Sequence, residues 1–168
     1  MDDSDIEDTL DAVSEEFRTG TGKPENGLDV DDPALLQLRK SCRMLKAVES
    51  LQEQNGYYTV IIEASFAAIE RSIQFYLQEK GYIREDEFVD HRKVYELGEN
   101  AALYGGNFKD KLIRLWENNR SRTYYREGVG TEKNAILMVK LAELIHGHVL
   151  QLAGESHECI CNAASPEN

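Results

Sequence analysis

Residues 56–81 read GYYTVIIEASFAAIERSIQFYLQEKG, and this stretch decides the fold. Apolar side chains recur along it at the three- and four-residue spacing of a helix, as at Ile62, Phe66, Ile69 and Ile73. A helix that is apolar on most of its circumference needs other elements around it. Charged residues interrupt the run, which argues against a membrane span. We therefore predict a central core helix that ends near the two bracketing glycines.

Further apolar stripes of helical spacing lie before and after this helix. The pair Asp32 and Pro33 is typical of a helix start, because an acidic cap precedes a proline in the first turn. Later starts and stops predict helices over about 33–54, 90–103, from 107 until the glycines at 128 and 130, and 131–154. The sequence thus predicts an all-α protein, an antiparallel bundle of four to five helices over residues 33–153.

The acidic charge is concentrated at the start of the chain. The 168 residues carry a formal net charge of −12, and residues 1–32 alone hold twelve acidic against two basic side chains. This segment is predicted to be an acidic flexible tail, and residues 154–168 a polar C-terminal tail. A helix from Ser4 to Arg18 that acts as a lid or partner-docking element is the alternative. High acidity also fits the salt-adapted cytoplasm of a halophilic archaeal source.

A basic stripe stands out against this acidity. Six Lys and Arg face only two acids between residues 107 and 126, a local net charge of +4. Arg120 and Arg122 can each present a planar fork of donors to phosphate, and Tyr124 and Tyr125 offer stacking rings and hydroxyls. A solvated helix face that pairs with acidic neighbours is the alternative interpretation. Arg126 closes the stripe and completes the predicted nucleic-acid or nucleotide-binding set.

The central helix resembles the second helix of HEPN domains. Paired aromatics, small residues, an Ala-x-Glu-like element and a leucine before glycine carry the resemblance; these are Tyr57, Tyr58, Ala64, Ala67, Ala68, Glu70, Leu77 and Gly81. His91 matches the family's third-helix histidine and Arg120 its arginine motif. The resemblance spans residues 33–153.

Membership of that family would imply a helical homodimer with two arginine motifs across one cleft. Many HEPN proteins are metal-independent ribonucleases, commonly toxins or defence effectors, and some act beside a nucleotidyltransferase antitoxin. Their motif ends in a histidine that moves a proton while the arginine stabilises charge. Here Tyr125 stands in that place, and a tyrosine hydroxyl is a poor base at neutral pH. The chain resembles the HEPN branch whose motif ends in Tyr, so whether it is an enzyme stays open.

The other polar residues of the bundle receive supporting roles. Glu63 and Glu70 are predicted to pair with bundle arginines, and to orient Arg120 if they meet it. His91 is predicted to be a structural hydrogen-bonding residue, and His146 and His148 to be surface or satisfied core residues.

The three cysteines do not form a disulfide framework, because their number is odd. Cys42 is interpreted as a small buried hydrophobe. The run His157-x-Cys159-x-Cys161 could hold zinc only with a fourth ligand from elsewhere. The sequence therefore predicts no metal and no cofactor.

Three functions remain open from the sequence. The first is a HEPN-like cytoplasmic homodimer that binds RNA or a nucleotide through Arg120, Arg122 and Tyr125, as a ribonuclease or toxin-type component of a toxin–antitoxin or defence system. The second is a non-catalytic partner of a nucleotidyltransferase, with Tyr124 or Tyr125 as modification site. The third is a purely structural dimerising module. No secretory leader or transmembrane run is recognisable, so no membrane partner is expected.

Overall fold

The computed structural model describes residues 3–20, 22–87, 89–123, 130–154 and 158–161, with the backbone alone at 3–4 and 120–123. Over these residues the secondary structure is six helices and no strand, which confirms the predicted all-α class. The helices are α1 (Asp3–Thr19), α2 (Pro33–Gln52), α3 (Tyr58–Glu79), α4 (His91–Asn100), α5 (Phe108–Thr123) and α6 (Glu132–Ala153).

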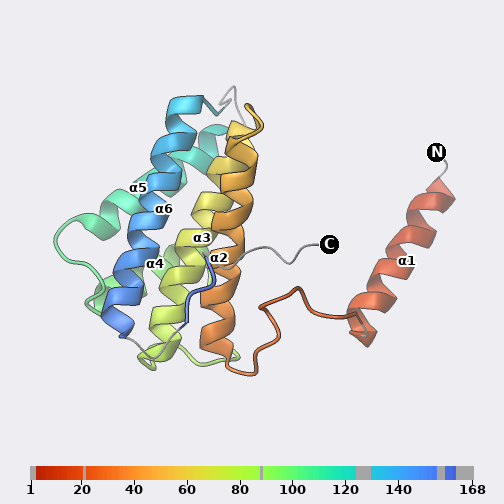
Figure 1. The fold of residues 1–168 in the computed structure, drawn as a ribbon, viewed down its shortest axis with the longest axis horizontal. Helices are drawn as coiled ribbons and strands as arrows, with labels where there is room; N and C mark the ends of the chain where they lie inside the picture. Colours follow the sequence, from red (N-terminus) through yellow and green to blue (C-terminus); the bar gives the residue numbers. More distant parts are fainter. Residues whose placement is uncertain (1–2, 21, 88, 124–129, 155–157, 162–168) are drawn as a thin grey trace.

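Helix α3 lies at the centre, as its sequence predicts. It packs against α2, α4 and α6, and Figure 1 shows it between α2 and α6. Ile61, Phe66, Ile69 and Ile73 are almost completely buried along it. Full burial of each such side chain contributes about 1.5–3 kcal/mol. Helix α6 is the one described helix whose length and hydropathy would also suit a membrane span, and core helices of bundles commonly share that property.

The predicted caps fix the starts of three helices. Asp32 accepts hydrogen bonds from the backbone N–H groups of Ala34 and Leu35 at the start of α2. Asp90 accepts from Lys93 N at 2.8 Å, and Thr131 accepts from Asn134 N at 3.3 Å. Each cap satisfies a backbone donor that the first helical turn leaves without a partner.

The leader contains both a helix and a packed turn. Helix α1 stands apart from the bundle in Figure 1, and its apolar side chains at Ile6, Leu10, Val13 and Phe17 are exposed. Residues 25–30 lie against α2, where Arg39 Nη1 donates to the carbonyl of Gly27 at 3.0 Å. The possible helix over residues 4–18 therefore does form. That the leader is flexible stays a prediction.

Helix α4 ends earlier than the sequence predicts. The chain leaves the helix at Ala101, and Ala102 adopts a left-handed conformation with φ of 56°. Tyr104 then folds back, and its hydroxyl donates to the carbonyl of Tyr95 at 2.7 Å. Burial, with Glu99 nearby, raises the pKa of Tyr104 far above its usual value, so the hydroxyl remains a donor. This contact joins the loop to α4.

The close packing of Tyr104 on Gly98 gives a testable expectation. A Cβ added at Gly98 would lie 2.7 Å from Tyr104 Cζ and closer still to its hydroxyl. Gly98→Ala should therefore lower the free energy of unfolding by about 1–3 kcal/mol, because the ring must move and lose its hydrogen bond. Gly147→Ala on α6 is the control, since nothing lies within 4 Å of its added Cβ.

Urea denaturation measures both variants. Gly147→Ala should gain about 1 kcal/mol at most, because alanine favours helix. Equal stability changes in the two variants would contradict the packing described for Tyr104.

Candidate functional site

A buried carboxylate organises the side of the bundle where α3 meets α4. Glu70 on α3 is 7% exposed. Its Oε1 accepts a hydrogen bond from the hydroxyl of Tyr95 at 3.0 Å, and its Oε2 pairs with His91 Nδ1 at 2.5 Å. A carboxylate this deeply buried is stable only with such partners. The described partners of Glu70 are thus a histidine and a tyrosine on α4 rather than the predicted bundle arginine.

His91 lies at the mouth of this arrangement, at the start of α4. Its side chain is 47% exposed, while Nδ1 faces Glu70. The imidazole stacks on Trp116 of α5, with ring centroids 5.6 Å apart and planes 28° from parallel. Because Nδ1 donates to the carboxylate when Glu70 is ionised, Nε2 is left as the other functional atom. His91 thus makes a hydrogen bond, as predicted, and its purely structural role stays a prediction.

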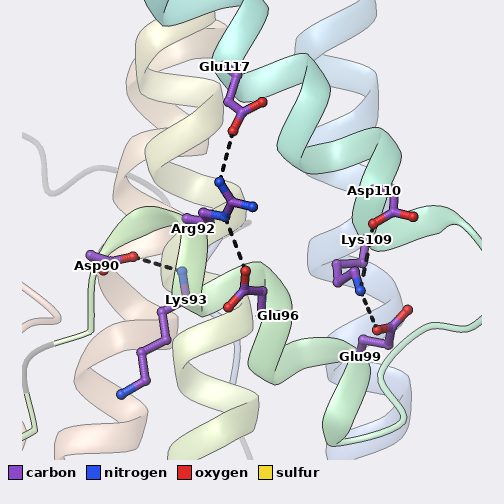
Figure 2. Close-up of polar contacts among 8 residues, drawn as sticks. All are labelled: Asp90, Arg92, Lys93, Glu96, Glu99, Lys109, Asp110 and Glu117. Carbon is purple, nitrogen blue, oxygen red and sulfur yellow. Dashed lines mark hydrogen bonds and ion pairs between the residues drawn. The ribbon is translucent and has the colours of Figure 1, made fainter.

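Ion pairs hold α4 against α5 and so fix the position of His91. Figure 2 shows Arg92 between Glu96 and Glu117, at 3.1 and 3.3 Å. Lys109 pairs with Glu99 at 2.8 Å and lies 3.6 Å from Asp110. Exposed pairs of this kind contribute about 0–1 kcal/mol each to folding stability. Their main effect is therefore to align α4 with α5.

A cleft of about 380 Å³, which we call the α3–α4 cleft, opens beside His91 between α2, α3 and the loop before α4. Arg71 lines it and donates to the side-chain amides of Gln37 at 2.8 Å and Gln74 at 3.0 Å. Burial lowers the pKa of Lys40, and so does repulsion by the nearby charge of Arg71. Within the described residues, neither cation forms an ion pair with a carboxylate. Arg71 is the one Lys or Arg among the described residues that line the cleft, and the buried carboxylate of Glu70 lines it as well.

The opposite rim of the cleft is acidic and carries Glu85, Glu87 and Asp90. Asp90 caps α4, and Glu87 lies 3.4 Å from Lys93 Nζ. The backbone N–H of Arg84 and the ammonium of Lys93 lower the pKa of Glu87. An anion entering the cleft would therefore lie on the Arg71 wall, since the acidic rim repels it elsewhere.

The predicted arginine motif is only partly covered by the description. Arg120 and Arg122 belong to the last turn of α5, and their side chains lie outside the described residues. Tyr124, Tyr125 and Arg126 lie outside them altogether. Glu63 on α3 accepts from Asn119 Nδ2 at 3.3 Å, which brings α3 close to the residue before Arg120.

A second cluster joins residues that the sequence treats separately. Cys42 on α2, His146 on α6, and Cys159 and Cys161 after α6 place their ligand atoms within 4.8 Å of one another. Cys42 is buried, as predicted, but its thiol faces this cluster rather than apolar side chains alone. His146 is 5% exposed. His157 lies outside the described residues.

Mutual contacts perturb the acidity of this cluster. Burial opposes the charged imidazole, but contacts with Cys159 and Cys42 outweigh it and raise the pKa of His146 to about 9. Contacts with Cys161 and Cys42 lower the pKa of the Cys159 thiol. Contacts with Cys159 and Cys42 raise the pKa of the Cys161 thiol, so the contacts shift the two terminal thiols in opposite directions.

The family of the chain follows from its sequence. A family model described as a domain of unknown function, DUF8154, matches residues 1–161. The chain belongs to the DUF8154 family. No curated protein and no solved structure matches it. The DUF8154 match covers the leader, the bundle and both terminal cysteines, so the α3–α4 cleft and the Cys/His cluster both lie within the family domain.

Spacing in the DUF8154 chain offered a partial signal for both sites. In the sequence Glu70 and His91 stand out as supporting residues, but Arg71 does not, because a single arginine on a core helix is common. Cys42 and His146 are 104 positions apart. Each is a possible metal ligand on an otherwise apolar helix face. Together with the Cys-x-Cys pair near the C-terminus, they are the sequence features that could have indicated the cluster.

Proposed function

We propose that this chain is a HEPN-like helical protein that binds a phosphate group of RNA or of a nucleotide in the α3–α4 cleft. The observation that carries the proposal is the arrangement of Arg71 and His91 around that cleft. Arg71 has only neutral partners among the described residues, and His91 is held by a buried carboxylate. Arginine and imidazole are the usual pair for binding a phosphate and moving a proton beside it.

The proposed chemistry follows from the geometry of His91. Glu70 fixes the ring through Nδ1, while Nε2 is left to exchange a proton at the cleft. Arg71, with Lys40 beside it, would stabilise negative charge on the phosphate. Such a site can assist cleavage of an RNA phosphodiester without a metal. Catalysis by His91 would also explain how the chain could act with Tyr125 at the position where HEPN ribonucleases carry histidine.

The proposal also includes the basic stripe of residues 107–126 and a second copy of the chain. Arg120 follows Trp116 by one helical turn on α5, and Trp116 stacks on His91. RNA bound at the cleft would therefore continue toward the stripe. A groove of about 290 Å³ near α5 carries Leu115 and Leu137, which are 38% and 55% exposed. We propose that a second copy of the chain covers this apolar groove, which would bring two arginine stripes together.

Removal of the Arg71 charge tests the site directly. Arg71→Met keeps most of the side-chain stem but loses the guanidinium, so it should weaken binding of a short single-stranded RNA about ten- to a hundredfold. Fluorescence anisotropy of labelled RNA measures the affinity, and unlabelled ADP as competitor separates nucleotide from RNA binding. Cleavage of the same RNA by the unmodified chain and by His91→Gln tests the catalytic step.

Arg92→Met is the matched control. It removes the same charge from the contact between α4 and α5, at a residue next to His91 that does not line the cleft. Its effect on RNA affinity should stay within about twofold, and both variants should melt near the unmodified chain. Equal losses in the two variants would show general electrostatic attraction and reject the cleft as the binding site.

A further inference from the structure

Four soft side chains from three parts of the chain meet at one point. Cys42 comes from the middle of α2, His146 from the last turns of α6, and Cys159 and Cys161 from the segment after α6. His146 Nε2 lies 3.3 Å from both Cys159 Sγ and Cys161 Sγ and 3.6 Å from Cys42 Sγ. The Sγ atoms of Cys42 and Cys159 are 3.4 Å apart.

These separations fit the corners of a tetrahedral metal site. With zinc–sulfur and zinc–nitrogen bonds of about 2.3 and 2.0–2.1 Å, a tetrahedron places two sulfurs about 3.8 Å apart and a sulfur and a nitrogen about 3.6 Å apart. The three cysteines are free rather than bonded in pairs. A cluster of thiols around one imidazole nitrogen also has no purely apolar explanation, because hydrophobic packing does not require convergent ligand atoms.

A chain of hydrogen bonds aims His146 at the thiols. Nδ1 of His146 lies 3.0 Å from Ser72 Oγ, which lies 2.8 Å from Ser41 Oγ, and Ser41 Oγ donates to the carbonyl of Ala68 at 2.9 Å. Ser41 and Ser72 are fully buried. If Nδ1 donates to Ser72, each hydroxyl donates onward and Nε2 keeps its lone pair for a metal. Metal-binding histidines are usually oriented by such a partner on the second nitrogen.

We propose that Cys42, His146, Cys159 and Cys161 form a closed Cys₃His site for one structural Zn²⁺ ion. Three thiolates and one imidazole are ligands that zinc prefers, and four protein ligands leave no open position for catalysis. The site is separate from the α3–α4 cleft and does not depend on the function proposed for that cleft.

The zinc would fasten the end of the chain and part of the leader to the bundle. Ile160 lies between the two terminal ligands, and its Cδ1 would be 2.8 Å from a Cβ added at Gly27. Gly27 is in turn held by Arg39 of α2. One ion would therefore connect the segment after α6 with α2, α6 and the turn at residues 25–30.

Metal content of the full chain, purified without an affinity tag under reducing and zinc-replete conditions, tests the proposal. Mass spectrometry of the metal should find about one zinc per chain after gel filtration. Replacement by Co²⁺ should give a thiolate-to-cobalt charge-transfer band and the intense d–d bands of tetrahedral cobalt. A chain that holds no zinc and shows no charge-transfer band with Co²⁺ would overturn the proposal.

Matched variants identify the ligands. Cys159→Ser and Cys161→Ser lie in the segment after α6, so they should lose the zinc while the helices persist by circular dichroism. His146→Asn should lose it as well, whereas His157→Asn and His148→Asn should retain it. His157 is the histidine of the local His-x-Cys-x-Cys run, and His148 Nε2 contacts the carbonyl of Leu103 instead.

Three results would each overturn the ligand set. The first is zinc that survives both terminal cysteine substitutions, which would place the ion elsewhere. The second is zinc lost in His157→Asn but kept in His146→Asn. The third is a native mass lower by two hydrogens with one reactive thiol, which would show a disulfide. Ser72→Ala should retain the ligands but bind zinc about 10–100-fold more weakly, because it removes the partner of His146 Nδ1.

Discussion

Removal of the zinc by a chelator is expected to lower the melting temperature of the full chain by roughly 10 °C. A ligand that binds only the folded state at about a thousand times its dissociation constant stabilises that state by about 4 kcal/mol. In a chain of this size, each kcal/mol shifts the melting temperature by about 2–4 °C. The loss should be large because, in the proposed site, one ion would connect the three segments that carry Cys42, His146, Cys159 and Cys161.

Differential scanning calorimetry with and without chelator measures this shift at constant ionic strength. Cys159→Ser serves as the control, since it should already melt at the lower temperature and should not respond to the chelator. Identical melts of the unmodified chain in both conditions would contradict a structural role for the metal.

Substitution of His91 by alanine is expected to destabilise the fold by about 3 kcal/mol. It leaves the carboxylate of Glu70, with side-chain exposure of only 9%, without the imidazole that pairs with its Oε2. Breaking a buried pair by removal of one member is costly because the remaining charge stays desolvated. Tyr95 continues to donate to Oε1, so the loss should fall short of a complete failure to fold.

Arg92→Ala is the control for this stability change. It changes the residue that follows His91 in α4 and removes two exposed ion pairs, so the free energy of unfolding should fall by about 0–1 kcal/mol. His91→Gln should recover part of the loss, because its amide can donate to Glu70. If His91→Ala and Arg92→Ala had the same small effect in urea denaturation, Glu70 would not depend on His91.

The helices of the bundle were predictable from the sequence because each is encoded locally, whereas the leader helix was only one of two alternatives. The central helix was expected between Gly56 and Gly81 and is found at Tyr58–Glu79. The caps at Asp32, Asp90 and Thr131 were also recognised, since each needs only a polar side chain before an apolar stripe. The sequence pattern predicts too late an end for α4, because the packing of Tyr104 on Gly98 is a tertiary contact.

The two candidate sites were less predictable because each depends on which helices are neighbours. In the sequence, Cys42 has only apolar neighbours on its helix face. Its contacts with His146 and Cys159 form only when α6 and the segment after it pack beside α2. Arg71 lies on a helix otherwise assigned to the core, and its position becomes notable only when His91 closes the same cleft. The sequence shows which residue types are present, but which of them meet at one site depends on how the helices pack.

Intrinsic fluorescence of Trp116 tests the central proposal, phosphate binding at the α3–α4 cleft, most directly. It is the chain's single tryptophan and stacks on His91. A ligand that contacts His91 should alter its emission. Titration with a short single-stranded RNA, or with ADP, should give a saturable change whose midpoint matches the affinity from anisotropy and moves about ten- to a hundredfold in Arg71→Met. RNA binding by anisotropy with no change in Trp116 emission, or with the same midpoint in Arg71→Met, would contradict binding in the cleft.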